Sequence, residues 1–277
     1  MDGSLVFDLG VNNGDDTAHY LQRGHRVLGV DADPAMVAEC EKRFAREIAD
    51  GRLTLLNVAI APQAGTTTFY VSHGNRGAWS SLDRHEASRG RLAVTPTPVA
   101  ARTLGSLLDE YGVPFYMKID IEGGGSACLQ DLRPAAVPKY LSFEALEGRL
   151  EDLFTAARCG YTGFKLIDQL RGFRQVVPPP LHTWGLVLDT GAYLARRAIR
   201  SLPGVPRVAR LVRRALRPPD RRGATGHVWG WPLSSSGPMA EETDGPWRSL
   251  EEVAYAWLYY VRKTRTASWF DVHCTHA

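Results

Sequence analysis

The chain has 277 residues, of which 44% are apolar and 23% are charged, and these values are ordinary for a soluble globular protein with its own core. Its four cysteines are far apart and form no C-x-x-C pair, which excludes a zinc knuckle and a disulfide framework and favours reduced thiols. The chain has no run of eighteen apolar residues, and the first expected strand leaves no room for a signal peptide. We therefore expect a cytoplasmic protein without an integral membrane segment.

Short β-branched runs alternate with helical patterns over the first 165 residues, which is typical of a parallel sheet covered by helices. Strands are expected at residues 5–9, 27–30, 53–60, 66–71, 115–121, 140–144 and 161–167, with a last strand at 268–273. Helices are expected from Asp15 or Asp16, over 34–49, 103–111 and 123–132, and up to Cys159. Residues 72–92 are rich in Gly, Ser, Arg and Asn, and this composition indicates a long loop near a site.

About a hundred residues separate the strand at 161–167 from the last strand, far more than an ordinary connection. The predicted organisation is a core at 1–180, an insertion or cap at 181–265 and a final core strand at 266–277. Residues 234–246 have the composition of a turn-rich loop, and Ser249 with Glu252 predicts a capping box at the start of a helix.

The net charge of +3 is unevenly spread, because residues 196–222 hold ten arginines and one acid, which leaves the rest of the chain acidic. Two amphipathic helices are expected at 193–200 and 207–217, separated by Pro203 and Pro206. They are interpreted as solvated helices on the sheet domain, as a lid over an acceptor pocket, or as a surface for anionic substrates or an acidic membrane. Aromatic residues are absent from the arginine run itself, which disfavours nucleic-acid stacking, so no nucleic-acid partner is expected.

A glycine turn follows the first expected strand, in the pattern Asp8-x-Gly10-x-x-x-Gly14, and Asp31 ends the next apolar run. A strand, a glycine turn and a helix N-terminus let the backbone approach a ligand closely, and an acid about twenty residues further on suits ribose hydroxyls. The glycines lie four apart and follow a carboxylate, whereas a dinucleotide site has the G-x-G-x-x-G spacing. A carboxylate suits a cofactor with an ammonium and a sulfonium, so the pattern favours S-adenosylmethionine.

Further acids are expected at the carboxyl edge of the sheet. Asp120 and Glu122 end the strand at 115–121, and Glu144 ends the strand at 140–144. Two acids two residues apart lie on one face of a strand, at the edge where α/β sheets bind ligands. Like charges that converge raise each other's pKa unless they meet a cation or a metal, and Glu122 is equally interpreted as a capping or salt-bridged residue.

Three stretches resemble the FkbM family of class I S-adenosylmethionine-dependent methyltransferases: residues 7–14 (FDLGVNNG), 118–123 (KIDIEG) and 140–144 (YLSFE). Residues 57–60, 80–82 and 269–273 are similar to that family as well. The resemblance covers about residues 5–175 and implies a Rossmann-like α/β fold. That fold is a seven-stranded, mostly parallel sheet with an antiparallel last strand and flanking helices, here with the arginine-rich insertion before the last strand.

The resemblance also implies roles for individual residues. The methionine end of the cofactor would be held by Asp8, Gly10, Asn12 and Gly14, with Asp8 acting through the loop or on the ammonium. Asp31 would bind the ribose hydroxyls, and Asn57 and Val58 would flank the adenine. Asp120 would lie close to the cofactor's amino group or to the acceptor. One departure is plain, because the family usually has a second glutamate where this chain has Gly125.

Methyl transfer to a hydroxyl needs alignment and removal of the acceptor proton, for which histidine is the usual base. His73 is the first candidate and His182 the second, while Glu122 and Glu144 are alternative bases. The two glutamates would also suit a divalent cation that lowers the hydroxyl pKa, but no metal is favoured.

The leading hypothesis is an O-methyltransferase acting on a hydroxyl of a small molecule, a sugar or a natural product. The alternatives are a nicotinamide-dependent oxidoreductase, disfavoured by the missing third glycine, and a non-catalytic module that binds a partner through the arginine-rich segment. Homo-oligomerisation is left open.

Overall fold

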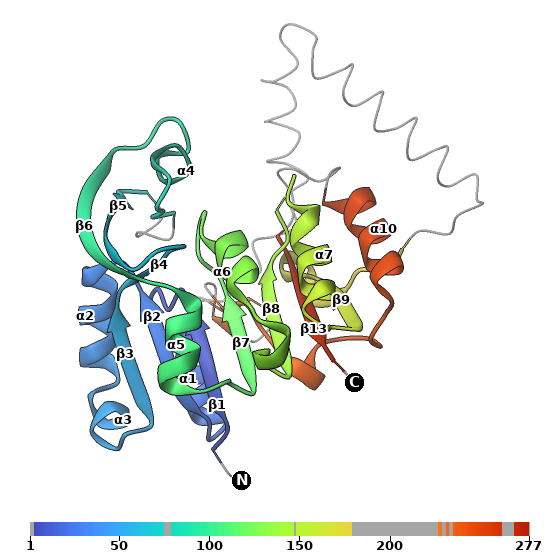
Figure 1. The fold of residues 1–277 in the computed structure, drawn as a ribbon, viewed down its shortest axis with the longest axis horizontal. Helices are drawn as coiled ribbons and strands as arrows, with labels where there is room; N and C mark the ends of the chain where they lie inside the picture. The colour runs from blue at the N-terminus through green and yellow to red at the C-terminus, as the bar shows by residue number, and fades with distance from the viewer. Residues whose placement is uncertain are drawn as a thin grey trace, which may run out of the picture.

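An eight-stranded sheet forms the centre of the computed structural model (Figure 1), which describes residues 3–74, 79–146, 148–178, 227–228, 231–232, 235–261 and 269–276. Its strands lie in the order β10-β9-β13-β8-β7-β1-β2-β3. Their bounds are β1 Leu5–Leu9, β2 Arg26–Asp31, β3 Leu53–Asn57, β7 Tyr116–Ile119, β8 Tyr140–Glu144, β9 Gly163–Asp168, β10 Arg174–Gln175 and β13 Phe270–Thr275.

The connections of this sheet reverse direction at β1. The chain runs outward through β2 and β3, then returns to place β7 on the other side of β1 and continues to β8. The last long strand, β13, inserts between β8 and β9 and is antiparallel to both. This confirms the predicted Rossmann-like sheet with a reversed last strand, and the short β10 extends the expected seven strands to eight. Ligands of such sheets bind at the carboxyl edge where the order reverses, here between β1 and β7.

Helices cover both faces of the sheet. The bounds are α1 Asp15–Gln22, α2 Pro34–Arg43, α3 Ala45–Ala49, α4 Arg84–Ser88, α5 Leu104–Tyr111, α6 Gly125–Asp131, α7 Leu150–Arg158 and α10 Leu250–Tyr260. One face packs against α5, α6, α7 and α10, which follow one another across it (Figure 1). The opposite face packs against α1, α2 and the segment around Met239 and Ala240. The α10 helix begins with the predicted capping box, because Ser249 and Glu252 each accept the other's backbone N–H.

A second, three-stranded sheet lies beside the carboxyl ends of β2 and β3 in Figure 1, with the order β4-β6-β5. Its strands are β4 Ala59–Ile60, β5 Gly65–Ser72 and β6 Val94–Arg102. The single strand expected at 53–60 is therefore wrong: it breaks at Val58, and its second part leaves the main sheet to pair with β6. Sequence reasoning missed β6, which contains Pro96 and Pro98, residues that cannot donate to a strand ladder.

Other expectations also changed. The helix expected over 34–49 is two helices that meet at Phe44, whose ring is buried against α1 and α2. The loop expected at 72–92 contains α4, whose start is capped by the Asp83 carboxylate. The arginine-rich helices expected at 193–200 and 207–217 lie outside the described residues, so the proposed division at 180 and 265 stays a prediction. Within the residues that the structure describes, no helix is long and apolar enough to cross a bilayer.

Candidate active site

The glycine turn between β1 and α1 lies directly against the end of β7. Gly10 has a φ of 95°, and a Cβ at this position would overlap the carbonyl oxygen of Asp120. The Gly10 N–H donates to the carbonyl of Val30, and the Asp120 N–H donates to the carbonyl of Leu9. These hydrogen bonds connect the carboxyl ends of β1, β2 and β7. Only glycine fits this close approach, so the turn and the end of β7 lie in contact at the carboxyl edge of the sheet.

Asp31 organises the far side of the turn. Its carboxylate accepts the N–H of Asn12 at 2.7 Å and that of Asp33 at 2.8 Å. Burial raises the pKa of Asp31 to about 6, and the two N–H donors oppose that rise. The Asn57 side chain, at the end of β3, donates to the Asp31 carbonyl at 3.1 Å. The structure therefore brings Asn12, Asp31 and Asn57 together, and the half-buried Val58 follows at the strand break.

Lys118 on β7 is the centre of a buried charge cluster that sequence reasoning missed. Its Nζ lies 2.8 Å from Asp16, 3.2 Å from Asp120 and 3.5 Å from Asp8, and only 5% of its side chain is exposed. We call these four residues the Lys118 cluster. A lysine in the middle of an apolar strand, beside an acid on the next strand, was the signal available in the sequence.

Asp8 belongs to this cluster and not to the surface. Its side chain is fully buried, and it accepts a hydrogen bond from the Thr17 hydroxyl of α1 at 2.6 Å. Burial raises the pKa of Asp8 to about 6, while Lys118 and Thr17 lower it. Of the two roles implied for Asp8, the geometry favours support of the turn over direct contact with a ligand.

Three carboxylates form a row at the carboxyl edge, on strands that are neighbours in the sheet. Asp120 follows β7, Glu144 ends β8, and Asp271 lies opposite Glu144 on β13. Burial raises the pKa of Glu144 well above its usual range, and Asp120, Glu122 and Asp271 raise it further. Burial likewise raises the pKa of Asp271 to about 8, against a hydrogen bond from Gln169. Two acids of the row, Glu144 and Asp271, therefore stay protonated to a higher pH than an exposed carboxylate does.

Glu122 and Glu144 differ in their partners. Glu122 pairs with Arg89 at 2.7 Å, and its pKa is raised to about 7 by burial, which outweighs the arginine. The carboxyl group of Glu144 forms no hydrogen bond or ion pair with any of the described residues, although its main chain belongs to the β8–β13 pair. Across those residues no group of three His, Cys, Asp or Glu side chains is arranged to hold a metal ion. The divalent-cation alternative stays untested.

The structure places His73 away from the row of acids. It follows β5 on the smaller sheet, where its exposed ring lies 2.8 Å from the Thr95 hydroxyl of β6. No hydrogen bond or ion pair between described residues connects it to Glu122 or Glu144. His182 lies outside the described residues.

The segment from Ser81 to Arg89, which contains α4, packs on the β7–α6 turn. The Ser81 hydroxyl donates to the carbonyl of Glu122 at 2.8 Å, and Arg89 pairs with the Glu122 carboxylate. Glu86 lies 3.4 Å from Arg149, which precedes α7. The smaller sheet is thereby connected to the edge that carries the acids.

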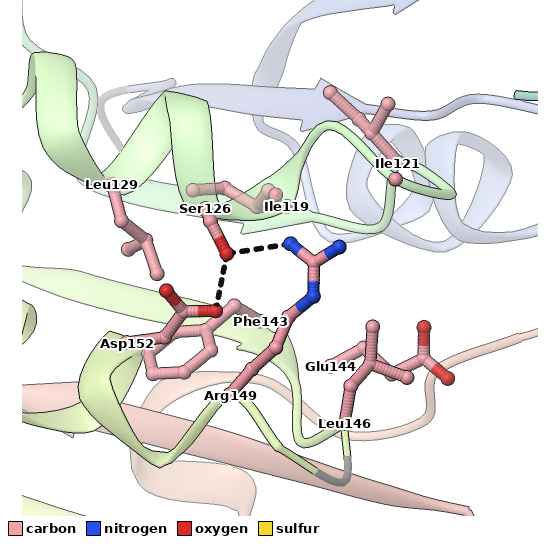
Figure 2. A pocket seen from close by; sticks show the side chains of 11 residues that line it. Ile119, Ile121, Ser126, Leu129, Phe143, Glu144, Leu146, Arg149 and Asp152 are labelled. Atoms are coloured by element: carbon pink, nitrogen blue, oxygen red, sulfur yellow. Dashed lines mark hydrogen bonds between the residues drawn. The ribbon is translucent and has the colours of Figure 1, made fainter. Parts of the chain in front are cut away.

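A small recess lies beside this contact, between α6, the end of β8 and the start of α7. Figure 2 shows the Ser126 hydroxyl between Arg149 and Asp152: it accepts from Arg149 and donates to Asp152, each at 2.7 Å. Gly125 lines the recess, and the Glu144 carboxyl points away from this hydrogen-bonded group. The atom nearest to a Cβ built on Gly125 is a methyl group of Ile119 at 3.8 Å, so a larger residue has room there.

We expect Gly125→Glu to be tolerated and to raise the free energy of unfolding by up to about 1 kcal/mol. The change removes a glycine from the first turn of α6 and adds an acid at a helix N-terminus, where both are favourable. Thermal unfolding of the variant and the wild type checks this. Gly124→Glu is the matched control, because a Cβ there lies 2.9 Å from the Ile121 side chain. A loss of stability in Gly125→Glu as large as in the control would contradict the expectation.

Comparison with known proteins identifies the class. Residues 8–160 match the family model described as the methyltransferase FkbM domain, which covers more than half of the chain. The chain therefore belongs to the FkbM methyltransferase family. The matched span includes the glycine turn, the four residues of the Lys118 cluster, Glu122 and Glu144.

Individual relatives are more distant. A probable ribosomal RNA small subunit methyltransferase A of Methanospirillum hungatei is 43% identical over 56 residues, which cover 20% of this chain and 22% of that protein. The chain thus spans about a fifth of the length of this relative. Among solved structures, a precorrin-6y C5,15-methyltransferase from Geobacter metallireducens is 14% identical, with a TM-score of 0.36 over 61% of this chain and 68% of the other. A TehB-like S-adenosylmethionine-dependent methyltransferase from Corynebacterium glutamicum is also 14% identical, with a TM-score of 0.32 over 60% and 69%.

Proposed function

We propose that this chain is an S-adenosylmethionine-dependent O-methyltransferase that acts on a hydroxyl of a small molecule, a sugar or a natural product. The proposal rests on the arrangement of residues at the carboxyl edge of the sheet. There the Gly10 turn, the Asp31 carboxylate and an acid without a described partner, Glu144, border one region of an FkbM-family methyltransferase.

The residues at this edge fit the cofactor. Gly10 lets the turn after β1 lie directly against the end of β7, which brings the turn and Asp120 together at this edge. Asp31, held by the N–H groups of Asn12 and Asp33, suits the ribose hydroxyls. The excess of carboxylates over cations near Asp120 suits a ligand with an ammonium and a sulfonium, and would repel a diphosphate.

The bound cofactor would supply an electrophilic methyl group, and the chain would supply alignment and a proton acceptor. Glu144 is the favoured acceptor for the proton of the substrate hydroxyl. Glu122 is already paired with Arg89, and His73 lies on the smaller sheet. A raised pKa makes a carboxylate a stronger base, which helps proton removal as long as the group is ionised. Activity should accordingly rise with pH until Glu144 is fully ionised.

We expect Glu144→Gln to lower kcat by about 10²- to 10⁴-fold and to change KM little, because the amide keeps the shape but accepts no proton. The rise of activity with pH should disappear in the same variant. The measurement is methyl transfer from labelled S-adenosylmethionine to a panel of hydroxyl-bearing acceptors, with the product identified by mass.

Glu122→Gln is the matched control, since it makes the same chemical change in the turn that follows β7, and we expect it to retain at least about a tenth of the activity. A Glu144→Gln enzyme as active as this control would exclude Glu144 as the base. If the wild type binds S-adenosylmethionine but methylates no acceptor, the non-catalytic module becomes the better interpretation.

A further inference from the structure

Residues 235–237 form a buried segment that meets the Lys118 cluster from outside the family-matched part of the chain. The Ser235 hydroxyl and the Ser236 N–H both donate to the Asp16 carboxylate, the latter at 3.1 Å. The Ser236 hydroxyl donates to Asp120 at 3.4 Å. Both serines are more than nine-tenths buried, although the sequence predicts a turn-rich loop here.

The segment is held in place on its other side. The Gly237 N–H donates to the Ser235 hydroxyl at 3.0 Å, and a Cβ on Gly237 would overlap the ring of Phe173. Met239 and Ala240, which follow, are buried with α1, α2 and β7 in the apolar core of that face. The contacts to Asp16 and Asp120 are therefore part of a packed structure.

Asp16 connects this segment to the candidate cofactor site through Lys118. Asp16 and Asp120 both contact the Lys118 ammonium group, at 2.8 and 3.2 Å. Burial of a carboxylate costs free energy unless hydrogen-bond donors satisfy its oxygens. Ser235 and Ser236 each give one donor to the Asp16 carboxylate, so Asp16 does not depend on Lys118 alone. Lys118 can therefore remain in contact with Asp120.

Asp120 itself needs such support. Its side chain is 43% exposed, whereas those of Asp8, Asp16 and Lys118 are 5% exposed or less. Its described side-chain partners are Lys118 and Ser236, and its main chain is the surface against which Gly10 lies. Without these partners the carboxylate would be free to rotate toward solvent, and a ligand would have to restore its order on binding.

We propose that Ser235 and Ser236 are positioning residues of the cofactor site, which fix the Asp120 carboxylate directly and through Asp16 and Lys118. The inference rests on the proposed function, because it assigns Asp120 to the cofactor's ammonium side. It makes residues beyond the family-matched span part of the methyl-donor site.

The test uses the full chain with both hydroxyls removed, Ser235→Ala together with Ser236→Ala. We expect the Kd for S-adenosylmethionine, measured by calorimetry, to rise about tenfold, as loss of a hydrogen bond to a charged group predicts. Ser236→Ala alone removes only the contact to Asp120 and should raise the Kd about threefold. This milder variant keeps the test decisive if the double variant fails to fold.

The matched control is Ser249→Ala, which removes the capping hydroxyl of α10 on the opposite face and lowers stability without touching the cluster. Its Kd should equal that of the wild type. A Kd for both Ser236→Ala and the double variant within twofold of the wild type, or an equal rise in Ser249→Ala, would overturn the positioning role. Absence of S-adenosylmethionine binding by the wild type would instead overturn the proposed function.

Discussion

Gly10→Ala is expected to weaken S-adenosylmethionine binding by at least about 100-fold, because displacement of binding groups by about 1 Å has effects of this size. The added methyl group would overlap the Asp120 carbonyl, so either the glycine turn or the end of β7 must move. Both are walls of the proposed site. We also expect a loss of about 3 kcal/mol in the free energy of unfolding, from steric overlap added to an unfavourable φ. Calorimetry and urea denaturation measure the two effects.

Gly24→Ala separates the overlap from the backbone effect. Gly24 has a φ of 85°, close to that of Gly10, but no atom lies within 4 Å of the position that its Cβ would take. This control should cost about 1–2 kcal/mol and leave cofactor affinity unchanged. If the two alanine variants bind S-adenosylmethionine equally well, the close approach of Gly10 to Asp120 is not needed for binding.

Lys118→Met is expected to lower the free energy of unfolding by about 3–5 kcal/mol at pH 7, because it leaves the buried Asp8 and Asp16 and the more exposed Asp120 without their shared cation. Urea denaturation measures the loss. The exposed Lys42 on α2 supplies the matched control, since Lys42→Met should change stability by no more than about 0.5 kcal/mol.

The difference in free energy of unfolding between Lys118→Met and the wild type should become smaller as the pH is lowered from 7 to 5. The pKa of Asp8 is already raised to about 6 with the lysine present, and removal of the lysine raises it further. A group whose pKa is higher in the folded than in the unfolded state stabilises the fold at low pH and loses this contribution as the pH rises. The raised pKa of Lys118 keeps the wild-type ammonium charged throughout this range. A deficit that grows toward pH 5, or that stays below about 1 kcal/mol at pH 7, would contradict the role assigned to the cluster.

Much of the fold could be predicted from local patterns. Strands β1 and β8 lie where their apolar runs predict, and the Ser249–Glu252 capping box is present, because these features depend on residues close in sequence. The strand expected over 53–60 failed because its pattern gives no sign that β4 has a different partner from β3. The missed β6 depends on pairing with β5, which overrides the two prolines.

For the candidate site, too, the sequence predicts some features and not others. The positions of Gly10, Asp31, Asp120 and Glu144 at strand ends follow from the sequence, since parallel strands deliver their carboxyl ends to one edge. The side chains that contact the candidate residues cannot be predicted from the sequence. Arg89 on Glu122 and Thr95 beside His73 come from the smaller sheet and its α4 segment. These contacts distinguish Glu144 from two of the other candidate bases, Glu122 and His73.

The sequence by itself determined the methyltransferase class, the sheet and the glycine turn, because each of them depends on short motifs of residues that are close together in the chain. Only the tertiary structure decided which acids are paired. It buried Asp8 and Asp16 around Lys118, brought Ser235 and Ser236 onto Asp16 across 219 and 220 positions of sequence, and left Glu144 without a described partner. Charge pairing depends on distance and burial in the folded chain, and residues so far apart carry no local pattern that predicts their contact.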